Sequence, residues 1–178
     1  MNKKAYGPAQ IGMKSWKDVR NGLIEEVEKI PEDQMSFRAT PDTRSIAEIL
    51  QHIVETQKIL IGETCREDSN IRRQSFPAHA QEYAAGVRDV SDKQGLIELL
   101  RSSQDAAESA VLSNAHMWEA PMNGLTGQPT TKGAILTFAA SHEMYHRGQL
   151  TVYERLLNIE PVLTVKLKKL FAASGSSD

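Results

Sequence analysis

Two histidines one helical turn apart, His142 and His146, are the side chains of this chain best placed to do chemistry. They lie in residues 131–157, TKGAILTFAASHEMYHRGQLTVYERLL, where the apolar residues recur with the period of an α-helix. Side chains at i and i+4 leave the same face, about 5–6 Å apart at Cβ. A buried imidazole needs partners for two ring nitrogens, and each group without one costs about 1–3 kcal/mol. A shared metal ion would serve both rings, so the pair predicts a metal site.

Residues 142–146 read HEMYH and match H-E-x-x-H, the signature of zinc proteases in which the glutamate, here Glu143, is the general base. The extended form of that signature has a third histidine where this chain has Val152, and no histidine follows His146. A di-iron carboxylate bundle would need two E-x-x-H pairs, and Glu143 with His146 is the one pair present. A metalloprotease is therefore the less favoured alternative.

Length and composition limit the class of protein. A chain of 178 residues is enough for one domain with a sizeable core. The formal net charge of −2, with both signs interspersed, gives no basic surface for nucleic acid. Cys65 is the single cysteine, which excludes a disulfide framework and a cysteine-based zinc site. With no apolar run of signal or membrane-spanning length, we expect a cytoplasmic protein that acts on a small molecule, without nucleic-acid or membrane partners.

The apolar periodicity predicts four long amphipathic helices, at about residues 15–29, 45–64, 91–115 and 131–157. The connection over residues 65–90 is long enough to carry the chain back along a bundle, so that the second and third helices run parallel. No stretch has the alternation and turn signals of a strand. The prediction is an all-α four-helix bundle in a single domain over residues 1–178, with loose ends at 1–10 and 172–178.

The motif HEMYHRGQL, at residues 142–150, resembles the closing motif of the DinB/YfiT-like superfamily. His52, near the middle of the second helix in ILQHIVETQ, matches that family's first histidine, and the resemblance covers about residues 11–162. It implies an up-down-down-up bundle, often dimeric, with a divalent metal held by His52, His142 and His146. Members with known activity transfer low-molecular-weight thiols to electrophiles or isomerise with the help of a thiol. Asn158 stands where the family usually has a glycine after the last helix.

Three histidines leave at least one coordination position open, as in reactive metal sites. A thiol bound there is deprotonated, and bound water can reach a pKa of about 7, so the site needs no protein cysteine. Glu48 and Glu55 flank His52 by one helical turn, and Gln149 follows His146 by one turn, so these side chains could orient the ligands. Glu143 and Arg147 fall off the apolar stripe and are expected in salt bridges at the helix surface.

Other candidates have simpler explanations. Tyr145 and Tyr153 flank the pair and are expected to pack in the core. His79 and His116 lie in connections and are expected to be solvated surface residues. Imidazole ligands suit several metals; we expect zinc or nickel ahead of iron or manganese.

Two classes of function follow. The first is a metal-dependent transferase or hydrolase, best described as a thiol S-transferase or thiol-dependent isomerase that acts on a small electrophile as a homodimer. The second is a bundle that binds a metal or ligand without turnover. A third, less favoured, is a structural bundle whose buried histidines are hydrogen-bonded to Gln149 and Thr56.

Overall fold

The computed structural model describes residues 8–174, and the terminal segments 1–7 and 175–178 lie outside the described residues. Four long helices form the body of the molecule: α1 (Pro8–Lys29), α2 (Ile46–Thr64), α4 (Lys93–Ser113) and α5 (Lys132–Leu156). Two shorter helices, α3 (Phe76–Tyr83) and α6 (Val162–Ser174), join them. Single 3-10 turns occupy Glu32–Gln34, Val87–Asp89 and Ala115–Met117. No helix within the described residues is long and apolar enough to cross a membrane.

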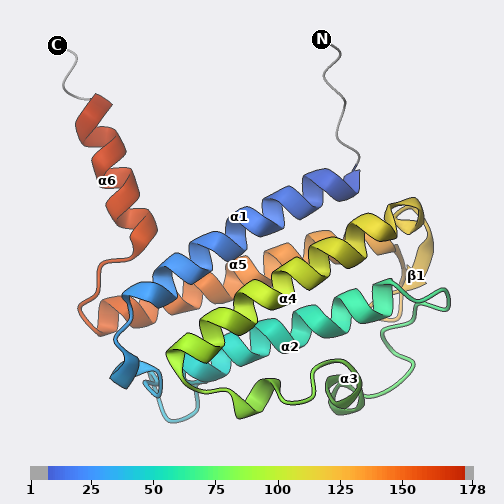
Figure 1. Ribbon diagram of the computed structural model, residues 1–178, viewed down its shortest axis with the longest axis horizontal. Helices are drawn as coiled ribbons and strands as arrows, with labels where there is room; N and C mark the ends of the chain where they lie inside the picture. The colour runs from blue at the N-terminus through green and yellow to red at the C-terminus, as the bar shows by residue number, and fades with distance from the viewer. Residues whose placement is uncertain (1–7, 175–178) are drawn as a thin grey trace.

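The four long helices pack as a ring in which α1 contacts α4 and α5, and α2 contacts the same two. Figure 1 shows that α1 and α5 run in one direction along the bundle, whereas α2 and α4 run in the other. The crossover that contains α3 returns the chain to the end where α2 begins, so α2 and α4 are parallel. The predicted four-helix bundle with up-down-down-up order is confirmed.

Local capping explains where the long helices begin. Ser45 and Glu48 form a reciprocal capping box at α2, in which each side chain accepts the other residue's backbone N–H. The Asp92 carboxylate accepts from Gly95 N at 2.8 Å before α4, and Thr131 Oγ1 accepts from Ala134 N before α5. These three helices begin within about two residues of the positions predicted from the sequence. The prediction for α1 was wrong, because this helix already begins at Pro8, inside the segment expected to be loose.

The end of α5 is set by Asn158, which adopts the left-handed conformation with φ of 60°. Its N–H bonds to Arg155 O, and Ile159 N bonds to Glu154 O at 2.7 Å, the paired bonds of a Schellman motif. Asparagine tolerates this conformation better than most residues. It therefore replaces the glycine expected from the resemblance without disturbing the helix end.

Two elements differ from the sequence-based prediction. A short antiparallel hairpin, β1 (Pro121–Asn123) and β2 (Pro129–Thr131), lies in the connection before α5 and pairs Met122 with Thr130. Residues 172–174 of the C-terminal segment expected to be loose (172–178) belong to the last turn of α6, and residues 175–178 lie outside the described residues. Helix α6 projects away from the bundle in Figure 1 and contacts α1 near its end.

A polar layer divides the bundle core into two apolar clusters. One cluster includes Leu23, Leu50, Leu96 and Leu150, and the other includes Trp16, Leu60, Val111 and Ile135. Between them, the buried Arg20 of α1 donates to Gln57 of α2, Ser103 of α4 and Glu143 of α5. One guanidinium therefore links all four long helices, which fixes their relative heights along the bundle.

Candidate metal centre

The three histidines predicted as ligands converge at one point between α2 and α5. His142 Nε2 lies 3.2 Å from His52 Nε2 and 3.1 Å from His146 Nε2. His52 comes from the middle of α2, and the other two come from successive turns of α5, which packs against α2. The three Nε2 atoms form a group that could hold one metal ion.

These nitrogens fit a divalent ion. Ligands about 2.05 Å from a tetrahedral zinc ion are about 3.3 Å from one another. The two distances between Nε2 atoms are close to that value. Burial, followed by positive charge from Arg44 and the neighbouring rings, lowers the pKa of His52 to about 3. Burial and then His146 lower the pKa of His142 to about 4. Both rings are therefore neutral at neutral pH, the form that binds metal.

Gln149 sets the tautomer of His146. The Gln149 Oε1 atom lies 2.7 Å from His146 Nδ1, and because an amide oxygen can only accept, Nδ1 carries the proton. The lone pair is thus on Nε2, the atom that faces the other two rings. Burial lowers the pKa of His146 despite this bond. The predicted contact of Gln149 with the ligand set is present, whereas His52 Nδ1 lies 3.5 Å from Thr56 Oγ1, at the limit of a hydrogen bond.

The group of histidines is open on one side. His52 and His142 are half-buried, and His52 lines a surface hollow of about 430 Å³ with residues of α2, α3 and the crossover. The rings of Phe138 and Tyr145 lie 5.9 Å and 5.1 Å from His142 and His146. Tyr145 is 65% exposed, so the prediction that it packs in the core was wrong, and it forms an aromatic wall beside the site.

Glu143 belongs to the interior of the bundle. Its Oε2 atom accepts from Trp16 Nε1 at 2.7 Å and from Arg20 Nη2 at 2.8 Å, and its side chain is buried. The prediction of a surface salt bridge was therefore wrong. A carboxylate held by Arg20 inside the core is also unsuited to be the general base of a metalloprotease, which disfavours that alternative.

Three further charged residues were predicted near the site. Arg147 pairs with the buried Glu26 of α1 at 3.0 Å and is itself largely buried, so the expected exposed salt bridge lies in the interior. The Glu48 carboxylate is held by Arg38 and the α2 cap, and the Glu55 carboxylate by Arg88 at 2.9 Å. Both glutamates line the hollow beside His52.

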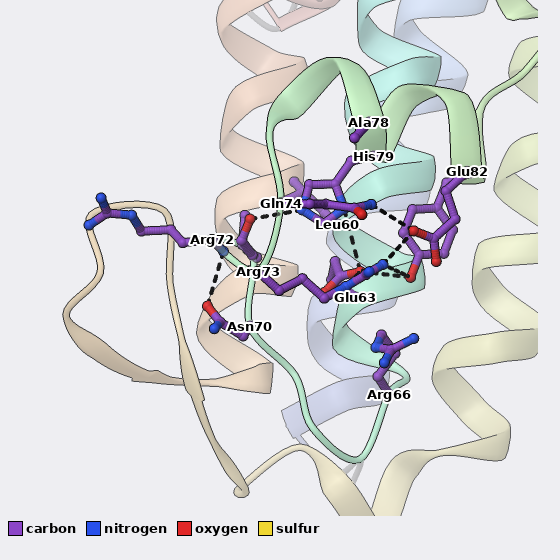
Figure 2. A network of polar contacts seen from close by, with 12 residues as sticks. Leu60, Glu63, Arg66, Asn70, Arg72, Arg73, Gln74, Ala78, His79 and Glu82 are labelled. Carbon is purple, nitrogen blue, oxygen red and sulfur yellow. Dashed lines mark hydrogen bonds and ion pairs between the residues drawn. The ribbon is translucent and has the colours of Figure 1, made fainter.

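A second group of possible metal ligands, Glu63, His79 and Glu82, lies where the crossover meets α2. Figure 2 shows the Arg73 guanidinium between the two carboxylates, 2.8 Å from Glu63 Oε1 and 2.6 Å from Glu82 Oε2. His79 donates from Nε2 to Ile71 O, and its Nδ1 accepts from the Gln74 amide. The cation position and the imidazole lone pair are thus already in use, and the network fastens the crossover to α2.

The two remaining histidines differ. His116 is exposed, as predicted. His79 is 1% exposed, so its assignment to the solvated surface was wrong. It begins the second turn of α3, which packs on α2, and a helix of eight residues gave too little periodicity to show which face is buried.

Sequence reasoning missed Arg44. This exposed residue precedes the α2 cap and lines the hollow that contains His52. Its charge contributes to the lowered pKa values of all three histidines. The signal that could have revealed it is position: a residue just before a helix lies two turns from His52 on that same helix.

The fold and the site together define a class of protein: up-down-down-up four-helix bundles in which three histidines converge at a partly open edge. A family model described as the DinB family matches residues 1–174, and the chain therefore belongs to the DinB family. No curated protein matches the chain.

Solved structures with the same fold include a DinB-like protein from Bacillus subtilis, with TM-score 0.63, 20% identity and coverage of 83% of this chain and 92% of that one. YfiT from Bacillus subtilis, described as a probable metal-dependent hydrolase with an unusual four-helix bundle topology, has TM-score 0.60 and 13% identity over 90% and 94% of the two chains. The mycothiol-dependent maleylpyruvate isomerase has TM-score 0.66 and 12% identity over 81% of this chain and 61% of its own. At these identities the likeness shows the fold.

Proposed function

We propose that this protein is a divalent-metal-dependent enzyme that joins a low-molecular-weight thiol to a small electrophile, by transfer or by thiol-assisted isomerisation. His52, His142 and His146 are the metal ligands in this proposal. The observation that supports it is the convergence of three Nε2 atoms at a partly open edge of the bundle. The Nε2 atom of His142 lies 3.2 Å from that of His52 and 3.1 Å from that of His146.

The residues around the histidines support a reactive site. A divalent ion held by the three histidines would supply Lewis acidity that lowers the pKa of a thiol or of water. Gln149 keeps the lone pair of His146 on Nε2, the atom that faces His142, and burial lowers the pKa of the ring and so favours its neutral form. Tyr145 and Phe138 provide an apolar wall on which a small molecule can rest.

The protein's own thiol is a poor nucleophile. Cys65, at the end of α2, is half-buried, and burial raises the pKa of its thiol. Its Sγ donates weakly to Ala110 O and accepts weakly from the Asn114 amide, beside the apolar cluster that contains Trp16 and Leu60. A thiol brought in from solution is therefore the better source of sulfur. The thiol-dependent and metal-dependent relatives with this fold agree with that chemistry.

The proposed enzyme is a homodimer. Phe138, Val152 and Leu156 are exposed along α5, and Leu163 and Leu167 are exposed on α6, although these are residues that usually pack against other protein. Light scattering on the purified protein tests this: a mass near twice 19.8 kDa is expected.

The experiment that tests the metal proposal is elemental analysis of untagged protein beside His52→Ala. About one divalent ion per chain, absent from the variant, is the expected result, and it would justify assays with small thiols and electrophiles. Protein that takes up neither zinc nor nickel after incubation would contradict the proposal and favour a bundle that binds its ligand without metal.

A further inference from the structure

Arg44 occupies a special place beside the histidines. It lines two surface hollows. The first, of about 430 Å³, is the hollow that contains His52, and the second, of about 500 Å³, contains Gln149 and Tyr153. Arg44 and Glu48 line both. Its main chain is fixed by the Tyr153 hydroxyl, which donates to Arg44 O at 2.9 Å, and by the α2 cap at Ser45.

The other charged groups of these hollows are mostly paired. Arg38 donates to Glu48 through both terminal nitrogens, and Arg88 donates to Glu55 through Nε and Nη2. Within residues 8–174, the Arg44 guanidinium forms no ion pair. Asp42, two positions before it, lines the second hollow and also forms no ion pair within these residues. An exposed guanidinium without a partner is the group best suited to receive an added carboxylate, because its planar donors match both carboxylate oxygens.

The electrostatic surroundings of the histidines point the same way. After burial, Arg44 is the largest charge effect on His52 and, with the neighbouring rings, it lowers the pKa of His142. The neighbouring acidic groups that face this hollow, Glu48 and Glu55, are neutralised by arginines. Asp42 lines only the second hollow, so in the hollow that contains His52 the Arg44 guanidinium is the charge without a paired partner among the described lining residues, and it attracts an anion.

We propose that Arg44 binds the carboxylate of a small molecule whose other end reaches the three histidines, and that this selects carboxylate-bearing substrates. The inference rests on the proposed function and narrows its substrate class. The carboxylate can belong to the thiol or to the electrophile; the two sources share one chemistry and are separated by experiment.

The thiol arm uses cobalt-loaded protein, in which a bound thiolate gives a sulfur-to-metal absorption band. The probes are 3-mercaptopropionate and its neutral analogue 3-mercaptopropanol, titrated into wild type and Arg44→Ala. The preference for the acid over the alcohol should fall about two- to fivefold in the variant, the size of one exposed ion pair. The carboxylate of the acid could also chelate the cobalt ion. This effect is the same in wild type and Arg44→Ala, so it cancels when the preferences of the two proteins are compared.

The second arm tests a carboxylate that is not part of a thiol, and it uses metal-free protein and glutarate, a dicarboxylate that stands in for the electrophile's carboxylate. In nitrogen-15 NMR spectra, the Arg44 Nε–Hε signal, assigned by its absence from Arg44→Ala, should shift with glutarate, and less so at high salt. The control is Arg101→Ala, which removes a half-exposed arginine of α4 that pairs with Glu28 of α1, lies outside both hollows, and changes the net charge equally.

The outcomes separate the two proposals. No cobalt binding, or no band with either thiol, would overturn the proposed function, while a glutarate shift at Arg44 would still support the carboxylate site. A band with both thiols, an unchanged preference in Arg44→Ala and no glutarate shift would overturn the inference alone. An equal loss of preference in Arg101→Ala would overturn it too, because the effect would then come from net charge.

Discussion

His142 and Glu143 are neighbours in the sequence, yet they take part in different structures on different sides of α5. His142 Nε2 lies 3.2 Å from His52 Nε2 at the open edge, whereas Glu143 Oε2 accepts from Trp16 and Arg20 in the core. The segment HEMYH therefore combines two candidate metal ligands with one half of a buried ion pair. The glutamate stabilises the core of the bundle, whereas the two histidines meet His52 between α2 and α5, with His142 half-buried and His146 buried.

The first prediction concerns this ion pair. Glu143→Ala should lower the free energy of unfolding by about 3–5 kcal/mol, because it leaves the Arg20 charge buried without its counterion. Urea unfolding measures this, and metal binding by the folded variant should persist. The control, Glu108→Ala, removes the partly exposed partner of Lys17 and should cost about 0–1 kcal/mol.

Where Glu143→Ala fails to fold, Glu143→Gln provides the test, since it keeps the shape and one acceptor oxygen. A variant with wild-type stability that has lost its metal would show that Glu143 serves the site and would contradict the assignment to the core.

The second prediction separates the two groups of possible ligands. His142→Ala should abolish metal binding, whereas His79→Ala should keep it and instead lower the free energy of unfolding by about 1–3 kcal/mol, because Ile71 O loses its donor inside the protein. Metal content by elemental analysis and unfolding by urea give both values. Loss of metal in His79→Ala at unchanged stability would place the ion at Glu63 and Glu82.

Much of the fold could be predicted from local sequence patterns. The apolar periodicity of a helix is a property of a few consecutive residues, so the four long helices were predicted close to the bounds that the structure gives, except at the start of α1. The pair of His142 and His146 was readable for the same reason, because i and i+4 fix a shared face. The place of His52 came from the family resemblance, since a single histidine carries no periodicity.

The polar layer could not be read in this way. Arg20 and Glu143 are separated by 123 residues, and their contact depends on the height at which α1 and α5 meet. A signal was nevertheless present, because Arg20 lies one turn after Trp16 and almost one before Leu23, on a stripe that is otherwise apolar. An arginine on such a stripe requires a buried acceptor.

The third prediction concerns Gln149. Gln149→Ala should weaken metal affinity about 10–100-fold, because His146 loses the acceptor that fixes its Nδ1–H tautomer. Competition with a chelator of known affinity measures this. The control is Ser141→Ala, an exposed residue of α5 that bonds within its own helix to Thr137 O. Equal affinities in Gln149→Ala and the control would show that His146 is oriented by packing alone.

A pair of buried carboxyl groups joins α5 to the start of α6. Glu26 accepts from Arg147 at 3.0 Å and from Val162 N at 2.5 Å, while neither Glu154 oxygen accepts a bond within the described residues. Burial, followed by the charge of Glu26, raises the pKa of Glu154 to about 8. Glu154 is therefore protonated at neutral pH, which removes the charge repulsion between the two carboxyl groups.

The fourth prediction follows from that proton. The pKa of Glu154 is higher in the folded protein than the ordinary 4.5, so the folded state holds one proton more between about pH 4.5 and pH 8. Its contribution to stability is complete below this window and is lost as the pH rises through it, by at most about 1.4 kcal/mol per pH unit.

Glu154→Gln keeps a donor that does not titrate, so its free energy of unfolding should fall less over the same range. The neutral histidines contribute equally to both proteins, so the difference between the two urea-unfolding profiles isolates Glu154. Parallel profiles from about pH 5 to about pH 8 would mean that Glu154 is already ionised in the folded protein, and that α6 is attached to the bundle without a shared proton.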